Sequence, residues 1–87
     1  MFELGQIVAT PAALAILEEN GLEYAALLYR HASLESTELG EEDQQANRAA
    51  LKNGERILSR YTVSGTKLYV ITEWDRSVTT ILLAEEY

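Results

Sequence analysis

The chain has 87 residues, of which 47% are hydrophobic, with one proline, no cysteine and a formal net charge of −7. This size and composition predict one domain, residues 1–87, that buries a core, and they exclude disulfides, thiolate zinc sites and cysteine nucleophiles. Because the N-terminus lacks a secretory signal and no window approaches the ~20 apolar residues of a membrane span, we expect a soluble, cytoplasmic protein.

Acidic residues are concentrated in the first half of the chain. Residues 1–45 contain nine acids and one base, whereas residues 46–87 contain five acids and six bases. An acidic front repels nucleic-acid phosphates and attracts basic protein surfaces, although such charge also serves ordinary solubility. We therefore expect a protein partner with a basic surface, bound by an acidic face that comprises Glu35, Glu38, Glu41, Glu42 and Asp43.

The N-terminal part predicts a strand followed by a helix. An apolar run at residues 4–9 ends before Thr10-Pro11, and proline forces its predecessor toward extended geometry. Thr10 is a suitable N-cap, with Pro11 in the first helical position. The helix should end near Gly21, with Leu22 folding back onto its last turn.

Two further helices are predicted before the spacing of apolar residues changes from three or four to two. Residues 23–32 present apolar side chains at spacings of three and four, with Arg30 and His31 in the last turn, where cations suit the helix dipole. Residues 33–40 are polar without periodicity and predict a loop. Residues 41–53 open with three acids and end before Gly54, which predicts the third helix.

The last third predicts an antiparallel meander. Apolar residues alternate along three runs separated by two turn signals: strands at 57–63, 68–71 and 78–83, and turns at 64–66 and 74–77. With the first strand included, the order of elements predicts an α+β fold in which an antiparallel sheet packs against two or three helices on one face. The place of the first strand in the sheet is left open.

The segment Glu73–Thr80 combines charges, hydroxyls and a tryptophan at a predicted corner. In a structural interpretation, Asp75 and Ser77 accept hydrogen bonds from the turn and Arg76 pairs with Glu73 or Asp75. In a functional interpretation, Trp74 and Arg76 are partner-binding anchors, because these residue types dominate interface energetics. We take Glu73, Trp74, Asp75, Arg76 and Ser77 as a second candidate partner-binding site.

No catalytic constellation emerges from the sequence. His31 is the only histidine, and a triad with Ser33 or Ser77 and Asp75 lacks a nucleophile elbow and an identifiable oxyanion hole. We therefore expect a helix-end or surface histidine, no catalytic residue and no enzyme activity.

Metal, cofactor and nucleic-acid sites are also not expected. The consecutive acids 41–43 point about 100° apart on a helix and cannot converge on one ion. Arg48, Lys52 and Arg56 recur every four residues, but no aromatic residues flank them and the total charge is not basic. The chain contains no glycine-rich phosphate loop, so we expect no nucleotide cofactor.

Several segments resemble a family of small, uncharacterised bacterial proteins from plasmids, phages and chromosomes, often labelled "plasmid-related protein" or "type I restriction endonuclease subunit M". The resemblance lies in Leu4-Gly5-Gln6-Ile7-Val8-Ala9-Thr10-Pro11, Arg30-His31, Glu41-Glu42-Asp43, Arg56-Ile57-Leu58-Ser59, Val70-Ile71-Thr72-Glu73, Asp75-Arg76-Ser77 and Thr79-Thr80-Ile81-Leu82-Leu83. It implies a mobile-element context. A methyltransferase activity is not implied, because the chain is too short for a Rossmann-like cofactor domain.

Together these observations predict a non-enzymatic interaction protein, with an anti-defence role against a CRISPR or restriction complex as the specific hypothesis. The alternative is a small structural or regulatory module that self-associates, as a homodimer, through an exposed sheet edge. A hydrolase that uses His31 or Asp75 is the third hypothesis.

Overall fold

The computed structural model describes residues 2–33 and 41–87, and side chains in the second range from residue 45 onward. The elements follow in the order β1 (Gln6–Ala9), α1 (Pro11–Glu19), α2 (Tyr24–Ala32), α3 (Glu41–Asn53), β2 (Ile57–Val63), β3 (Thr66–Thr72), β4 (Val78–Leu83) and the short 3-10 helix η1 (Ala84–Glu86). This confirms an α+β fold with three helices and four strands in the described ranges.

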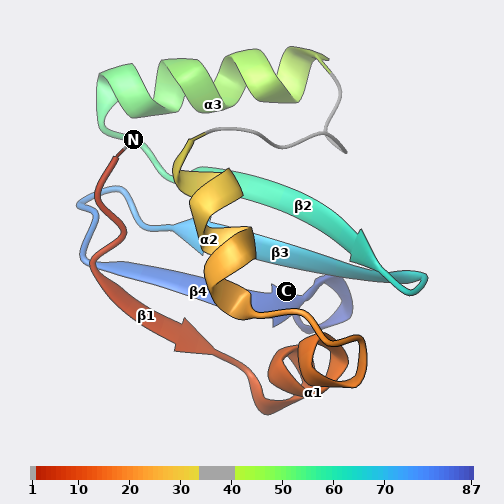
Figure 1. The fold of residues 1–87 in the computed structure, drawn as a ribbon. Helices are drawn as coiled ribbons and strands as arrows, with labels where there is room; N and C mark the ends of the chain where they lie inside the picture. Colours follow the sequence, from red (N-terminus) through yellow and green to blue (C-terminus); the bar gives the residue numbers. More distant parts are fainter. Residues whose placement is uncertain (1, 34–40) are drawn as a thin grey trace.

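The four strands form one sheet in the order β1-β4-β3-β2 (Figure 1). β2, β3 and β4 are the predicted antiparallel meander, but β1 pairs with β4 in parallel, so the prediction of a purely antiparallel sheet is wrong. The reason is the long connection from β1 to β2: the helices carry the chain across to the opposite edge of the sheet, and parallel neighbours require such a crossover.

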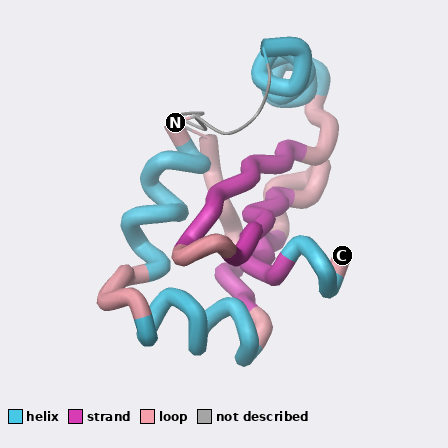
Figure 2. The backbone as a smooth tube through the Cα atoms, turned by 90° about the vertical axis from the view of Figure 1, so that its right-hand side faces the viewer, coloured by secondary structure: helices cyan, strands magenta, loops and turns pink. Residues whose placement is uncertain are grey.

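Two of the three helices cover one face of the sheet, which agrees with the prediction of two or three helices on one face. α1 and α2 cover one face, η1 lies on the other, and α3 lies over the edge formed by β2 (Figures 1 and 2). The core lies under α1 and α2, because alternate residues of each strand face these helices. Its buried members are Ala13, Leu17, Leu27, Leu28, Tyr61, Val63, Leu68, Val70, Ile81 and Leu83.

The predicted helix signals at α1 are confirmed. The Thr10 hydroxyl accepts a hydrogen bond from the Ala13 N–H at 3.2 Å, which satisfies one free donor of the first turn. At the other end, the Leu22 N–H donates to the Leu17 carbonyl at 2.9 Å, and Gly21 has the left-handed φ of +65°. This Schellman-type end directs the chain back along α1 and sets the start of α2 beside it.

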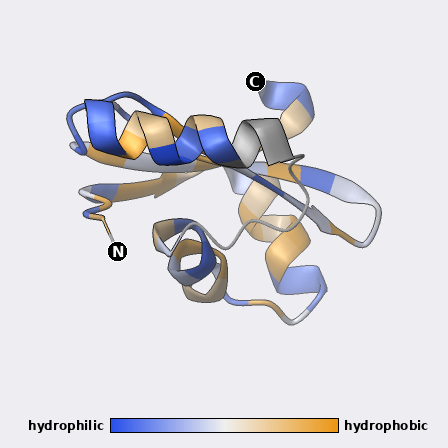
Figure 3. Ribbon diagram, turned by 90° about the horizontal axis from the view of Figure 1, so that it is seen from above, coloured by the Kyte–Doolittle hydropathy of each residue, from blue (hydrophilic) through white to orange (hydrophobic). Residues whose placement is uncertain are grey.

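The two edges of the sheet differ. On β2, the Asn47 side chain of α3 accepts from the Leu58 N–H at 3.2 Å and donates to the Leu58 carbonyl at 2.6 Å, which satisfies both groups as a neighbouring strand would. From above, α3 lies along this edge and is largely hydrophilic (Figure 3). β1 forms the other edge, and in the described ranges its only strand neighbour is β4.

Candidate functional site

The polar corner between β3 and β4 is a tight turn with a strained residue. The Glu73 N–H donates to the Val78 carbonyl at 3.0 Å, and the Arg76 N–H donates to the Glu73 carbonyl at 2.9 Å. Arg76 has a φ of +60°, a left-handed conformation that is uncommon for a residue other than glycine. Asp75 Oδ1 accepts from the Ser77 N–H at 3.1 Å and from its hydroxyl at 2.6 Å, and these bonds lower the pKa of Asp75.

Arg76 joins this corner to the end of α3. Its guanidinium donates to the backbone carbonyls of Glu55 at 2.6 Å, Glu73 at 3.0 Å and Ala50 at 3.4 Å. The predicted Arg76 bond to Glu73 thus goes to the backbone carbonyl, and the guanidinium lies across the Phe2 ring, 5.6 Å from its centroid. These contacts support the structural interpretation for Asp75, Arg76 and Ser77, although the Ser77 hydroxyl donates to Asp75 instead of accepting from the turn.

Trp74 differs from its neighbours in the corner. Its side chain is 66% exposed, whereas the Arg76 side chain is half-buried and hydrogen-bonded. Trp74 and Arg76, which the sequence analysis took as two partner-binding anchors, therefore differ in exposure. Of the two, only Trp74 has a large exposed surface. Its role as a partner-binding residue stays a prediction.

His31 lies in the last turn of α2, which confirms the predicted helix-end position, but it is fully buried and is not a surface histidine. Its Nδ1 lies 2.7 Å from the hydroxyl of Ser59 on β2, and its Nε2 lies 2.8 Å from the hydroxyl of Thr72 on β3. Thr72 contacts the Thr79 hydroxyl on β4 at 2.8 Å, and Thr79 donates to the Leu4 carbonyl at 2.7 Å. We call these four side chains the histidine network.

The last acceptor fixes the direction of three of the four bonds in the histidine network. Because the Leu4 carbonyl can only accept, Thr79 donates to it, Thr72 donates to Thr79, and Nε2–H of His31 donates to Thr72. When the imidazole is neutral, its Nδ1 accepts from the Ser59 hydroxyl. The network is satisfied with a neutral imidazole, and burial together with the Arg76 charge lowers the pKa of His31 to about 4.

The proposed triads are not assembled. The His31 imidazole is hydrogen-bonded to the hydroxyls of Ser59 and Thr72, while Asp75 is bound to Ser77 at the surface. Ser59 and His31 are both 0% exposed, so neither reaches a substrate in this conformation.

The other predicted sites lie partly outside the described side chains. Glu35 and Glu38 of the acidic face fall outside the described residues, and for 41–43 the structure gives only the backbone, in the first turn of α3. Arg48 and Lys52 are exposed, and Arg56 donates to the Tyr87 hydroxyl at 2.5 Å. Among the side chains that the structure describes within residues 2–33 and 41–87, no group of three His, Asp or Glu is placed to hold a metal ion. No helix of the same ranges has the length and apolarity of a membrane span.

A solvent-exposed apolar groove runs along the β1 side of the molecule. It consists of two adjoining hollows that share Leu14 of α1 and Tyr24 of α2. The larger, of about 460 Å³, extends past Leu17 and Leu22, and the smaller, of about 240 Å³, extends to β1. We define the apolar groove by Ile7, Ala9, Leu14, Leu22 and Tyr24, of which Leu14, Leu22 and Tyr24 are 42–50% exposed.

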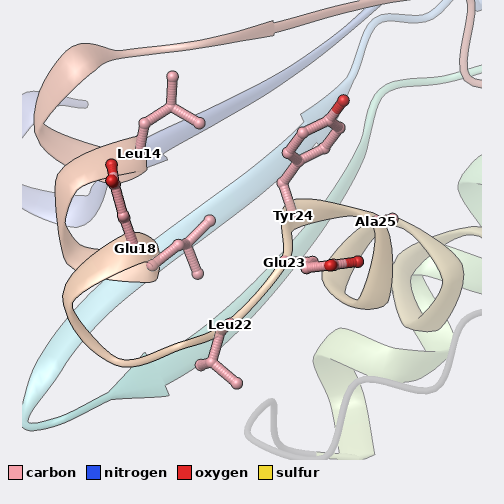
Figure 4. A pocket seen from close by; sticks show the side chains of 7 residues that line it. Leu14, Glu18, Leu22, Glu23, Tyr24 and Ala25 are labelled. Carbon is pink, nitrogen blue, oxygen red and sulfur yellow. The ribbon is translucent and has the colours of Figure 1, made fainter.

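Carboxylates border the apolar groove. Figure 4 shows Leu14 and Glu18 on α1 at one side of the larger hollow, and Glu23 and Tyr24 at the start of α2 on the other. The segment 2–29, which builds the groove, contains four acids and no lysine or arginine. The groove therefore combines an apolar floor with a purely negative rim.

Sequence reasoning missed the apolar groove, although α1 carried a signal for it. Every residue from Pro11 to Leu17 is apolar, so the first two turns of the helix are apolar on all sides. A helix that packs on one sheet buries only one side, as Ala13 and Leu17 do here, and the remaining apolar side chains stay at the surface.

Comparison of the chain with protein-family models, with curated proteins and with solved structures found no match in any of the three. The family resemblance inferred from the sequence stays a prediction.

Proposed function

We propose that this chain is a non-catalytic protein-binding module that contacts its partner through the apolar groove. The observation that carries the proposal is the exposure of Leu14, Leu22 and Tyr24 side by side, with carboxylates on the rim. Large apolar side chains that gather at a surface with a polar border are typical of binding sites. The burial of His31 and Ser59 supports a structural role for the histidine, and hence a non-enzymatic function.

The negative rim selects a partner with a basic surface. Glu18 and Glu23 border the groove, and the acids of the predicted acidic face, Glu35 to Asp43, add to the same sign of charge. Such a field speeds encounter and weakens with salt, while the apolar contacts determine how long the complex lasts. The specific proposal of an anti-defence inhibitor rests on this charge and on the family resemblance.

A capture experiment with matched variants tests the proposal that the chain binds a protein through the apolar groove. The tagged chain is incubated in lysate of a host cell at low and at moderate salt, and retained proteins are quantified for the wild type, for Leu14→Gln/Tyr24→Gln and for Leu51→Gln. Leu51 is the control because it is 39% exposed, as Leu14 is 42% exposed, but lies on α3 at the opposite edge of the sheet.

We expect proteins that bind the wild type and Leu51→Gln but not the groove variant, with retention that falls as salt rises. Equal retention by all three proteins, or no retained protein at low salt, would contradict the proposal. The alternative of self-association is favoured by the uncovered β1 edge, and it predicts a mass that doubles with concentration in light scattering.

A further inference from the structure

The free edge of β1 lies directly beside the apolar groove. The Gln6 N–H donates to the Ser77 carbonyl at 2.9 Å, and the Thr10 N–H donates to the Ile81 carbonyl at 3.0 Å. Alternate residues of a parallel strand bond to the same neighbour, so the N–H and C=O groups of Ile7 and Ala9 point away from β4. In the described ranges no strand lies beyond them, so four backbone groups are available for pairing.

The side chains of the same two residues face the groove. Ile7 and Ala9 line the smaller hollow together with Leu14 and Tyr24. A strand paired with β1 would place every second side chain over this hollow, because side chains alternate between the faces of a sheet. Backbone pairing and an apolar hollow for alternate side chains are the two elements of recognition by strand addition.

Building on the proposed function, we infer that the partner binds as an extended segment that adds a fifth strand to the sheet at β1. The segment has apolar side chains at every second position, seated over Leu14 and Tyr24, and lysine or arginine residues next to them. The charge of the surface defines this chemistry, since Glu18 and Glu23 line the groove and the segment 2–29 that builds it contains no lysine or arginine. A second copy of the chain fits less well, because it would bring two negative rims together.

The test uses a phage-displayed library of random twelve-residue peptides as the probe. The immobilised wild-type chain selects peptides, and those enriched are synthesised with a fluorophore and titrated by anisotropy. We expect enrichment of alternating apolar residues with adjacent lysine or arginine, and binding that weakens severalfold from low to moderate salt.

Two variants at one position separate backbone pairing from side-chain contact. Ile7→Pro removes an N–H that points away from β4, so the pairing with β4 is retained, whereas Ile7→Ala removes the side chain and keeps the N–H. We expect Ile7→Pro to bind the selected peptides about tenfold more weakly than Ile7→Ala, because it leaves a peptide carbonyl unpaired and places a ring at the edge.

Amide hydrogen exchange of the wild type keeps the test independent of these variants. The Ile7 and Ala9 amides should exchange rapidly in the free chain and become protected with the peptide bound. Selected peptides that leave both amides unprotected, that show a helical spacing of apolar residues or that are acidic would overturn the inference. So would protection of both amides in concentrated protein without peptide, which would identify a second copy as the occupant.

The two proposals fail separately. If the library yields no binder while capture from lysate depends on Leu14 and Tyr24, the strand-addition inference is wrong and the binding module stands. If capture is insensitive to the groove variant, the proposed function itself is wrong.

Discussion

Acidification from pH 7 to pH 4 should remove about 3 kcal/mol of the free energy of unfolding through His31 alone. The pKa of His31 is about 4 in the folded chain, and about 6.5 is usual for an exposed, unfolded histidine. Each pKa unit corresponds to about 1.4 kcal/mol, so the difference amounts to about 3 kcal/mol. A domain of this size has a free energy of unfolding of roughly 5–15 kcal/mol, so the effect is large.

The sign of this pH dependence follows from the neutral charge state of His31 in the folded chain. The folded chain holds His31 neutral, whereas the unfolded chain binds a proton below about pH 6.5. The stabilisation is therefore complete above pH 6.5 and is lost as the pH falls toward 4. Protonation places a charge in a desolvated position near Arg76 and forces the Ser59 hydroxyl to stop donating to Nδ1.

Urea denaturation at half-unit steps from pH 7.5 to pH 4.5 measures the effect. His31→Gln is the comparison because it cannot titrate, while Asp75 and Glu86, whose pKa values are also lowered, contribute equally to both proteins. We expect the wild type to lose about 2–3 kcal/mol more than the variant over this range. Parallel pH profiles, or an NMR titration that gives His31 a pKa near 6.5, would refute the reasoning, as would a neutral histidine protonated on Nδ1.

Three further predictions concern stability. Gly5→Ala should lower the free energy of unfolding by about 3 kcal/mol in thermal unfolding, because the new Cβ would lie 2.4 Å from two backbone carbonyl oxygens. Gly21 is the control, since it has nearly the same φ and no neighbour within 4 Å, and Gly21→Ala should lower that free energy by about 1 kcal/mol. Asn47→Ala should cost about 2 kcal/mol in urea unfolding, since two backbone groups at the β2 edge lose their partner, and an unchanged midpoint would contradict this. Trp74→Ala should change stability by less than about 0.5 kcal/mol and Arg76→Ala should lower it by about 2 kcal/mol; the reverse order would show that Trp74 is the structural residue.

Elements with local signals were predictable from the sequence. α3, β2 and β4 have the bounds that capping residues and alternation indicated, because these signals depend on neighbours within a few residues. The direction of β1 was not predictable, since it depends on how the whole helical segment returns to the sheet. Burial of His31 was missed because its helix-end position suggested a dipole contact.

A non-local signal for the histidine network was nevertheless present. Ser59, Thr72 and Thr79 are polar residues that each occupy a core-facing position in a strand of otherwise apolar core-facing residues. Buried hydroxyls on three adjacent strands need hydrogen-bond partners, and His31 is the only histidine that could serve as one. The register that aligns them became visible only in the assembled sheet.

The two edges of the sheet differ in how far they are covered, and this difference bears on the proposed function. At β2, Asn47 of α3 satisfies both backbone groups of Leu58, so this part of the edge is closed to other chains. At β1 the edge stays uncovered and has an apolar groove beside it, an arrangement that invites aggregation unless something restrains it. We expect Glu18 and Glu23 to supply that restraint, because their like charges would oppose a second copy at this surface, while the same carboxylates would attract the proposed basic segment. Replacing both with glutamine should therefore weaken peptide binding and, at the same time, increase self-association in light scattering. A change in only one of these two properties would separate the selection of the partner from the protection of the edge.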